Sequence, residues 1–91
     1  MNLEQLRQEI DKADAEILKA FCRRMDAVGE VAKTKIAKGI PVLDASREVS
    51  LLAGIEENTP DKYALYSRAL FTEMMRISRL YQQEIMDGVK E

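Results

Sequence analysis

The 91-residue chain has no histidine and no tryptophan, and Cys22 is its single cysteine. Without histidine, neither a Ser-His-Asp triad nor a His/Cys metal site can be built. One cysteine cannot form an internal disulfide, which fits a reducing compartment and leaves Cys22 for packing. An excess of basic charge is also lacking. The 14 basic and 16 acidic residues give a formal charge of −2, which argues against a nucleic-acid binder.

Long apolar runs and a basic leader are missing as well. No stretch approaches the roughly 18 apolar residues that span a bilayer. The start of the chain, MNLEQ, lacks the basic and then apolar regions of a secretory signal, so we expect a cytoplasmic protein without a membrane partner. With 46% hydrophobic, 33% charged and only 5% aromatic residues, the composition is typical of a globular, helical domain with an aliphatic core.

Glycine and proline are scarce in the first segment of the chain. Over residues 3–38 the apolar side chains recur every seven residues, with the spacing of an amphipathic helix rather than the alternation of a strand. Gly39, followed by Pro41, is a typical helix end. The sequence therefore predicts one long helix over about 3–38.

The remaining proline, Pro60, and two candidate caps predict two further helices. Asp44 can cap a short helix over about 45–57. Thr59 and Pro60 favour the start of a third, medium-length helix over about 60–86, after which the tail is expected to fray.

The length of the first helix sets the oligomeric expectation. Thirty-six helical residues make a rod of about 54 Å, whereas a compact globule of this size is roughly 30 Å across. A second chain is expected to cover the overhanging apolar stripe; a bend or break at Gly29 is the alternative. The predicted fold class is all-α, with one long, one short and one medium helix intertwined with a second chain in a homodimer.

Two cations interrupt the apolar face of the first segment. Arg24, Val28, Val31 and Lys35 follow a helical spacing that puts them in one line, with the two cations about 16 Å apart. Apolar side chains between two cations suit the wall of a pocket for an anion with a hydrocarbon body. The alternative is that both cations extend to water from the edge of a helix seam.

A similar line with neutral groups occurs in the third segment. Phe71, Met75, Ser78 and Gln82 share one helix face, where two hydrogen-bonding side chains close an apolar row. Ordinary solvated surface positions are the alternative for Ser78 and Gln82.

Arg7 is too far from Lys35 for the two to hold one small ligand within a chain, because 28 helical residues span about 42 Å. If two first helices pair antiparallel, Arg7 of one chain approaches Arg24 of the other. Together with the acidic pair Asp44 and Glu48, these cations suit a ligand that carries carboxylates and a hydroxyl group.

Spaced segments along nearly the whole chain resemble the all-helical chorismate mutases. The segments are LR-x-x-ID at 6–11, RR-M at 23–25, K-x-K at 33–35, G-x-PV-x-D-x-x-RE at 39–48 and S-x-x-x-Q at 78–82. They occur in the family's order, and the resemblance covers residues 3 to about 85. It implies that residues 1–91 form a single, short, free-standing chorismate mutase domain within an intertwined homodimer.

The resemblance also implies an activity. Chorismate mutases convert chorismate, a small dianion, to prephenate by an intramolecular Claisen rearrangement in phenylalanine and tyrosine biosynthesis, without a metal or cofactor. By this likeness Arg24, Lys35 and Gln82 are the catalytic residues. Lys35 binds a carboxylate and the ether oxygen, and Gln82 donates a hydrogen bond to the same oxygen.

The family's pattern implies further substrate-binding positions. Arg7, acting across the dimer, and Arg24 and Arg47, acting within the chain, hold carboxylates. By the same likeness, Ser78 assists carboxylate binding. Asp44 and Glu48 meet the ring hydroxyl, and Val31 and Met75 form apolar walls.

Two other functions are open at the level of sequence. The related isochorismate-pyruvate lyase uses a similar set of residues, although Asp44, Arg47 and Glu48 favour the mutase. A non-catalytic helical dimerisation module would tolerate other polar residues at the cation lines and would form no prephenate. Arg79, next to Ser78, has no role that the sequence assigns.

Overall fold

The computed structural model describes residues 1–90, which form helices and no strand. The elements in order are α1 (Leu3–Lys38), α2 (Ala45–Glu57), one turn of 3-10 helix called η1 (Asp61–Tyr63), and α3 (Ala64–Lys90). The predicted all-α class with one long, one short and one medium helix is confirmed. In the described part of the chain, no helix has the length and apolar character needed to cross a bilayer.

Local hydrogen bonds close both ends of α1. Asn2 and Gln5 form a reciprocal capping box, with 2.8 Å between Gln5 N and Asn2 Oδ1 and 2.9 Å between Asn2 N and Gln5 Oε1. Gly39 ends the helix in the left-handed conformation that favours glycine, with φ at 66°. The helix runs unbroken through Gly29, so the alternative of a break there is wrong.

Thr59 and Pro60 do not start the third helix, contrary to the prediction. Pro60 is extended, with φ −54° and ψ 140°. Thr59 Oγ1 donates to the Ile55 carbonyl at 2.6 Å and so closes the end of α2. The 3-10 turn η1 follows, and the α-helix begins at Ala64.

The end of the third helix also differs from the prediction. The tail after residue 86, expected to fray, continues as helix to Lys90. Gln83 Nε2 donates to Asp87 Oδ1 at 2.9 Å, a contact between side chains one turn apart that supports this last part of α3. Gly88 alone costs about 1 kcal/mol in a helix, which is too little to end it. Glu91 lies outside the described residues.

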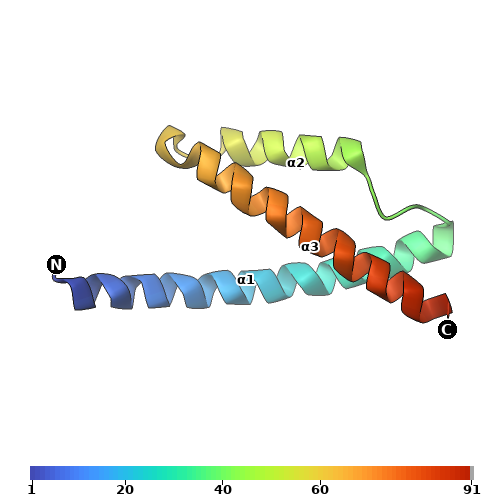
Figure 1. Ribbon diagram of the computed structural model, residues 1–91, viewed down its shortest axis with the longest axis horizontal. Coiled ribbons are helices and arrows are strands. Elements are labelled where there is room, and N and C mark those ends of the chain that lie inside the picture. Colours follow the sequence, from blue (N-terminus) through green and yellow to red (C-terminus); the bar gives the residue numbers. More distant parts are fainter. Residues whose placement is uncertain (91) are drawn as a thin grey trace.

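α3 holds the chain together because it contacts both other helices. Its first part runs beside α2, and its second part crosses the C-terminal half of α1 (Figure 1). The N-terminal half of α1 extends away from the rest of the chain, and the chain measures 53 × 26 × 14 Å. The shape therefore follows the length of α1.

The described chain has almost no core of its own. Among the described residues the buried hydrophobic side chains are Ala32 and Met75. The radius of gyration is 16.4 Å, against about 12 Å for a compact chain of this length. The accessible surface is 7192 Å², about 1,800 Å² more than a compact monomer of this mass exposes. Much of the excess is apolar, because large side chains of α1 are exposed, among them Leu3, Leu6, Ile10, Ile17 and Leu18.

Candidate active site

A cavity of about 620 Å³, counted with its open mouth, lies where the three helices come together. α1 supplies one wall and α3 another, and the connector with the start of α2 supplies the third. The lining residues are Arg24, Val28, Val31, Lys35, Val42, Asp44, Arg47, Glu48, Leu51, Met75, Ser78, Arg79 and Gln82.

Nine of the ten substrate-binding positions expected from the sequence line this one cavity. The structure therefore brings together side chains from α1, α2, α3 and the connector that are far apart in the sequence. Arg7 is the exception. It is exposed on the free half of α1, about 26 Å along the helix from Arg24, and does not reach the cavity of its own chain.

The cavity is positively charged although the chain is not. Four cationic side chains line it against the two carboxylates of Asp44 and Glu48, an excess of two positive charges. The whole chain carries a formal charge of −2. Charges of one sign gathered in a concave site attract ligands of the opposite sign, so this cavity favours a small anion.

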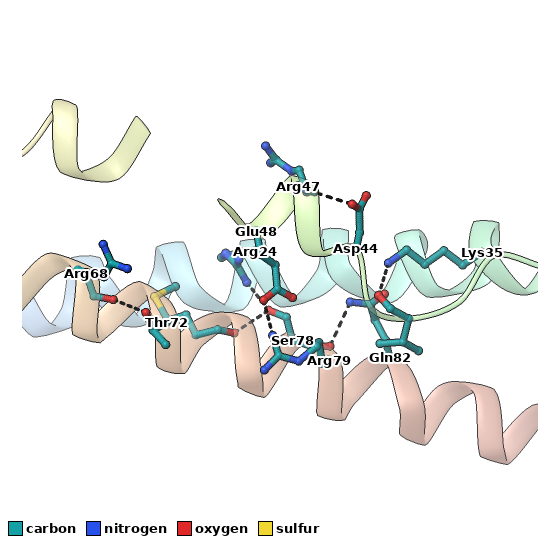
Figure 2. A network of polar contacts seen from close by, with 12 residues as sticks. Arg24, Lys35, Asp44, Arg47, Glu48, Arg68, Thr72, Ser78, Arg79 and Gln82 are labelled. Atoms are coloured by element: carbon teal, nitrogen blue, oxygen red, sulfur yellow. Dashed lines mark hydrogen bonds and ion pairs between the residues drawn. The ribbon is translucent and has the colours of Figure 1, made fainter. Parts of the chain in front are cut away.

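Ser78 holds Arg24 in the cavity. Arg24 Nη1 donates to Ser78 Oγ, and Ser78 Oγ in turn donates to the Met74 carbonyl at 2.8 Å (Figure 2). Ser78 is buried, with 6% of its surface exposed. Because the hydroxyl hydrogen is already given to the backbone, Ser78 orients the guanidinium, and the other N–H groups of Arg24 are left for a ligand.

Lys35 ties the connector to α1 and extends over the cavity. Its ammonium donates to the Val42 carbonyl at 2.7 Å (Figure 2). An ammonium has three hydrogens, so this bond leaves two for a ligand. The side chain is half-buried, which strengthens its interaction with an anion relative to an exposed lysine.

Gln82 lines the cavity and has one buried polar atom without a partner. The residue is buried, with 7% exposed, and its Nε2 donates to the Ser78 carbonyl at a long 3.3 Å. In the described part of the chain, Gln82 Oε1 is the buried side-chain polar atom that has no hydrogen-bond partner. Nε2 has a second hydrogen, which the bond to the Ser78 carbonyl leaves for a ligand.

Asp44 caps α2 and also lines the cavity. Its Oδ1 accepts from Arg47 N at 3.0 Å and from Ser46 Oγ at 3.1 Å. These bonds, the Arg47 N–H first, lower the pKa of the Asp44 carboxyl; desolvation opposes them, and the charges of Lys35 and Arg47 add to the lowering. The carboxylate is therefore ionised at neutral pH. The Arg47 guanidinium points outward, away from Ser78 and Gln82 (Figure 2).

Arg79 is a cavity residue that sequence reasoning missed. Its Nη1 lies 2.5 Å from Glu48 Oε1, and this ion pair joins α3 to α2 within the cavity lining. Arg79 follows Met75 by four residues and precedes Gln82 by three, so its place next to the predicted helix face was readable. The pairing of Arg79 with Glu48 could not be predicted from the sequence, because Glu48 is 31 residues away.

The fold and the cavity define a class: an all-helical protein with a positively charged cavity between its helices. The family model described as chorismate mutase type II matches residues 6–83, which is most of the chain. The protein belongs to this chorismate mutase family.

Relatives of known name cover parts of the chain. Over 50 residues, 55% of this chain, it is 38% identical to the T-protein of Haemophilus influenzae, and the match spans 13% of that protein. Over 59 residues, 65% of this chain, it is 37% identical to the intracellular chorismate mutase of Mycobacterium tuberculosis, and the match spans 56% of that protein. The chain therefore corresponds to only part of the length of each relative.

Proposed function

We propose that this protein is a chorismate mutase, which converts chorismate to prephenate by forming one C–C bond as one C–O bond breaks. The observation that carries the proposal is the convergence of Arg24, Lys35 and Gln82, from two helices, on one cavity with two excess positive charges. Chorismate is a dianion, so its charge is complementary to that excess.

The chemistry needs only the kinds of groups that line the cavity. The rearrangement requires no nucleophile, no proton transfer and no cofactor. The substrate has to be held with its side chain folded over the ring, so that the carbons that will join are close together; this is catalysis by orientation. In this proposal Val31 of α1 and Met75 of α3 are the apolar walls that hold the folded form.

Lys35 stabilises the charge that develops during the reaction. As the C–O bond breaks, negative charge grows on the ether oxygen, and a positioned cation there binds the transition state more strongly than the ground state. The 2.7 Å hydrogen bond from Lys35 Nζ to the Val42 carbonyl oxygen holds the ammonium in place. It leaves two hydrogens, one for the ether oxygen and one for a carboxylate.

Gln82 donates to the same ether oxygen through its amide nitrogen. Nε2 has two hydrogens and gives one to the Ser78 carbonyl over a long 3.3 Å, so the other hydrogen is available to the substrate. A hydrogen bond to an oxygen that becomes negative strengthens in the transition state.

The remaining polar residues bind the ends of the substrate. Arg24, oriented by Ser78, holds one carboxylate, and Arg47 turns inward from the mouth of the cavity to hold a carboxylate as well. Asp44 and Glu48 accept from the ring hydroxyl. Oδ1 of Asp44 is used by the helix cap, so its Oδ2 is the atom that faces the hydroxyl.

We also propose that two chains form an intertwined homodimer in which Arg7 of the partner subunit completes each site. The excess surface of about 1,800 Å² per chain corresponds to roughly 3,600 Å² in a dimer, within the range of obligate homodimers. The exposed apolar side chains Leu6, Ile10 and Ile17 lie on the half of α1 that carries Arg7. An antiparallel pairing of two such halves buries them and brings each Arg7 to the other chain's Arg24.

Incubation with chorismate, with identification of the product, tests the proposal. Prephenate is the expected product. Isochorismate, assayed in parallel for release of pyruvate, tests the lyase, and pyruvate from isochorismate without prephenate from chorismate would reassign the site. A folded dimer that transforms neither compound would be a non-catalytic dimerisation module.

A further inference from the structure

Two arginine–glutamate pairs connect α3 to α2, and they differ in their surroundings. Arg79 Nη1 lies 2.5 Å from Glu48 Oε1, and Arg68 Nη1 lies 2.6 Å from Glu56 Oε1. Arg79 and Glu48 line the cavity, with side chains 34% and 24% exposed. Arg68 and Glu56 are 57% and 37% exposed and lie outside the lining. The two pairs therefore separate the effect of joining the helices from an effect on the cavity.

A glutamate in a pocket for a dianion creates a problem that a neighbouring cation solves. A free carboxylate at this place repels the carboxylates of the ligand, and its flexible side chain can turn outward. The guanidinium of Arg79 fixes one carboxylate oxygen and neutralises the charge, while the second oxygen is left to accept a hydrogen bond. Figure 2 shows the pair beside the contact between Arg24 and Ser78, in the middle of the polar cluster.

We infer that Arg79 is a positioning residue that holds the Glu48 carboxylate toward the ring hydroxyl of the substrate and thereby makes the site selective for a hydroxylated ring. This inference rests on the proposed mutase function. Arg79 does not itself bind the substrate. Its effect passes through Glu48, and this separates it from Arg24, Lys35 and Arg47.

The kinetic test compares Arg79→Gln with the matched control Arg68→Gln, which breaks the other pair between the same helices. We expect Arg79→Gln to lower kcat/KM for chorismate about tenfold. Most of the loss should be in KM, because the hydroxyl contact is the same in the ground state and in the transition state. Arg68→Gln should match the wild type, and Arg79→Lys, which keeps the charge, should recover part of the loss.

Two further measurements ask whether the effect passes through Glu48 and the hydroxyl. In a Glu48→Gln background, Arg79→Gln should cause no additional loss, because there is no carboxylate left to position. On a chorismate analogue that lacks the ring hydroxyl, Arg79→Gln and wild type should be equal. The ratio of kcat/KM for the two substrates is measured on one protein sample, so partial unfolding of a variant does not affect this ratio.

The outcomes separate this inference from the proposed function. If the wild-type protein forms no prephenate, the proposed function fails and the inference fails with it. If the wild type is active but Arg79→Gln behaves like Arg68→Gln, only the inference is overturned. The inference is also overturned if Arg79→Gln loses tenfold in kcat/KM on the hydroxyl-free analogue as well. The same holds if this loss adds fully to that of Glu48→Gln, because Arg79 would then act on the substrate directly.

Discussion

At the scale of single residues, the cavity contains polar groups whose bonds are partly used within the chain and partly free. Ser78 gives its hydrogen to the Met74 carbonyl and accepts from Arg24. Lys35 gives one hydrogen to the Val42 carbonyl, and Gln82 leaves its Oε1 without a partner. Arg24 and Lys35, which are fixed by these bonds, need little reorganisation when a ligand arrives, and this favours electrostatic catalysis.

The role of Lys35 predicts a loss of turnover rather than of binding. Removing a donor that acts on developing charge costs about 100- to 1,000-fold in kcat, so we expect Lys35→Ala to fall in this range with a smaller change in KM. Lys33→Ala is the matched control, because Lys33 is on the same helix, 68% exposed and paired with Glu30. Steady-state kinetics on chorismate gives kcat and KM for both variants. Lys35→Ala that binds poorly but turns over normally would contradict the role.

The neutrality of Gln82 predicts activity that does not depend on acid. The amide carries its donor at every pH, whereas Gln82→Glu has a donor only when the carboxyl is protonated. We expect Gln82→Glu to lose about 100-fold in kcat/KM at neutral pH and to recover as the pH falls toward about 5. Gln83→Glu, at the exposed neighbouring position, is the control and should follow the wild-type profile. A pH profile of Gln82→Glu that parallels wild type would remove Gln82 from the ether oxygen.

At the scale of elements, the sequence predicts what local signals determine. The C-terminus of α1 and the N-terminus of α2 are at the predicted residues, because Gly39 and Asp44 are strong local caps. The start of α3 is displaced because Thr59 bonds backward to Ile55, a choice between two local partners that propensity does not decide. Helix spacing predicts most of the lining that α1 and α3 supply, whereas Arg47 was expected only from the family resemblance. The pairing of Arg79 with Glu48 does not follow from helix spacing, because it depends on how α2 lies against α3.

The cap of α2 predicts a dependence of stability on residue 44 and on pH. We expect Asp44→Ala to lower the melting temperature by a few degrees, and Asp44→Asn to retain most of the cap because its amide oxygen still accepts from Arg47 N. The folded-state pKa of Asp44 is lowered, so the ionised carboxylate stabilises the fold above an ordinary carboxyl pKa of roughly 4. This stabilisation is lost as the pH falls through the lower, folded-state value. Thermal unfolding at several pH values should show the wild-type advantage over Asp44→Asn shrinking only in acid.

At the scale of the whole molecule, the extended shape of the chain favours a dimer. A chain with a radius of gyration of 16.4 Å and a largely exposed apolar stripe on α1 leaves much apolar surface in water, so we expect a second chain to cover it. The same extension carries Arg7 about 26 Å from the cavity of its own chain. In the proposed dimer one feature explains both observations, because the helix half that covers the partner's apolar stripe also delivers Arg7 to the partner's cavity.

Shared sites predict that two inactive variants restore each other. Arg7→Ala damages the partner's site, and Lys35→Ala damages its own, so a mixed dimer keeps one intact site of two. When equal amounts are unfolded and refolded together, about half of the dimers are mixed, and about one quarter of wild-type activity should return. The control mixture, Arg24→Ala with Lys35→Ala, should stay inactive, because both residues act within one chain and every site then carries a lesion. Activity no higher than that of the separately refolded variants would show that Arg7 does not complete the partner's site.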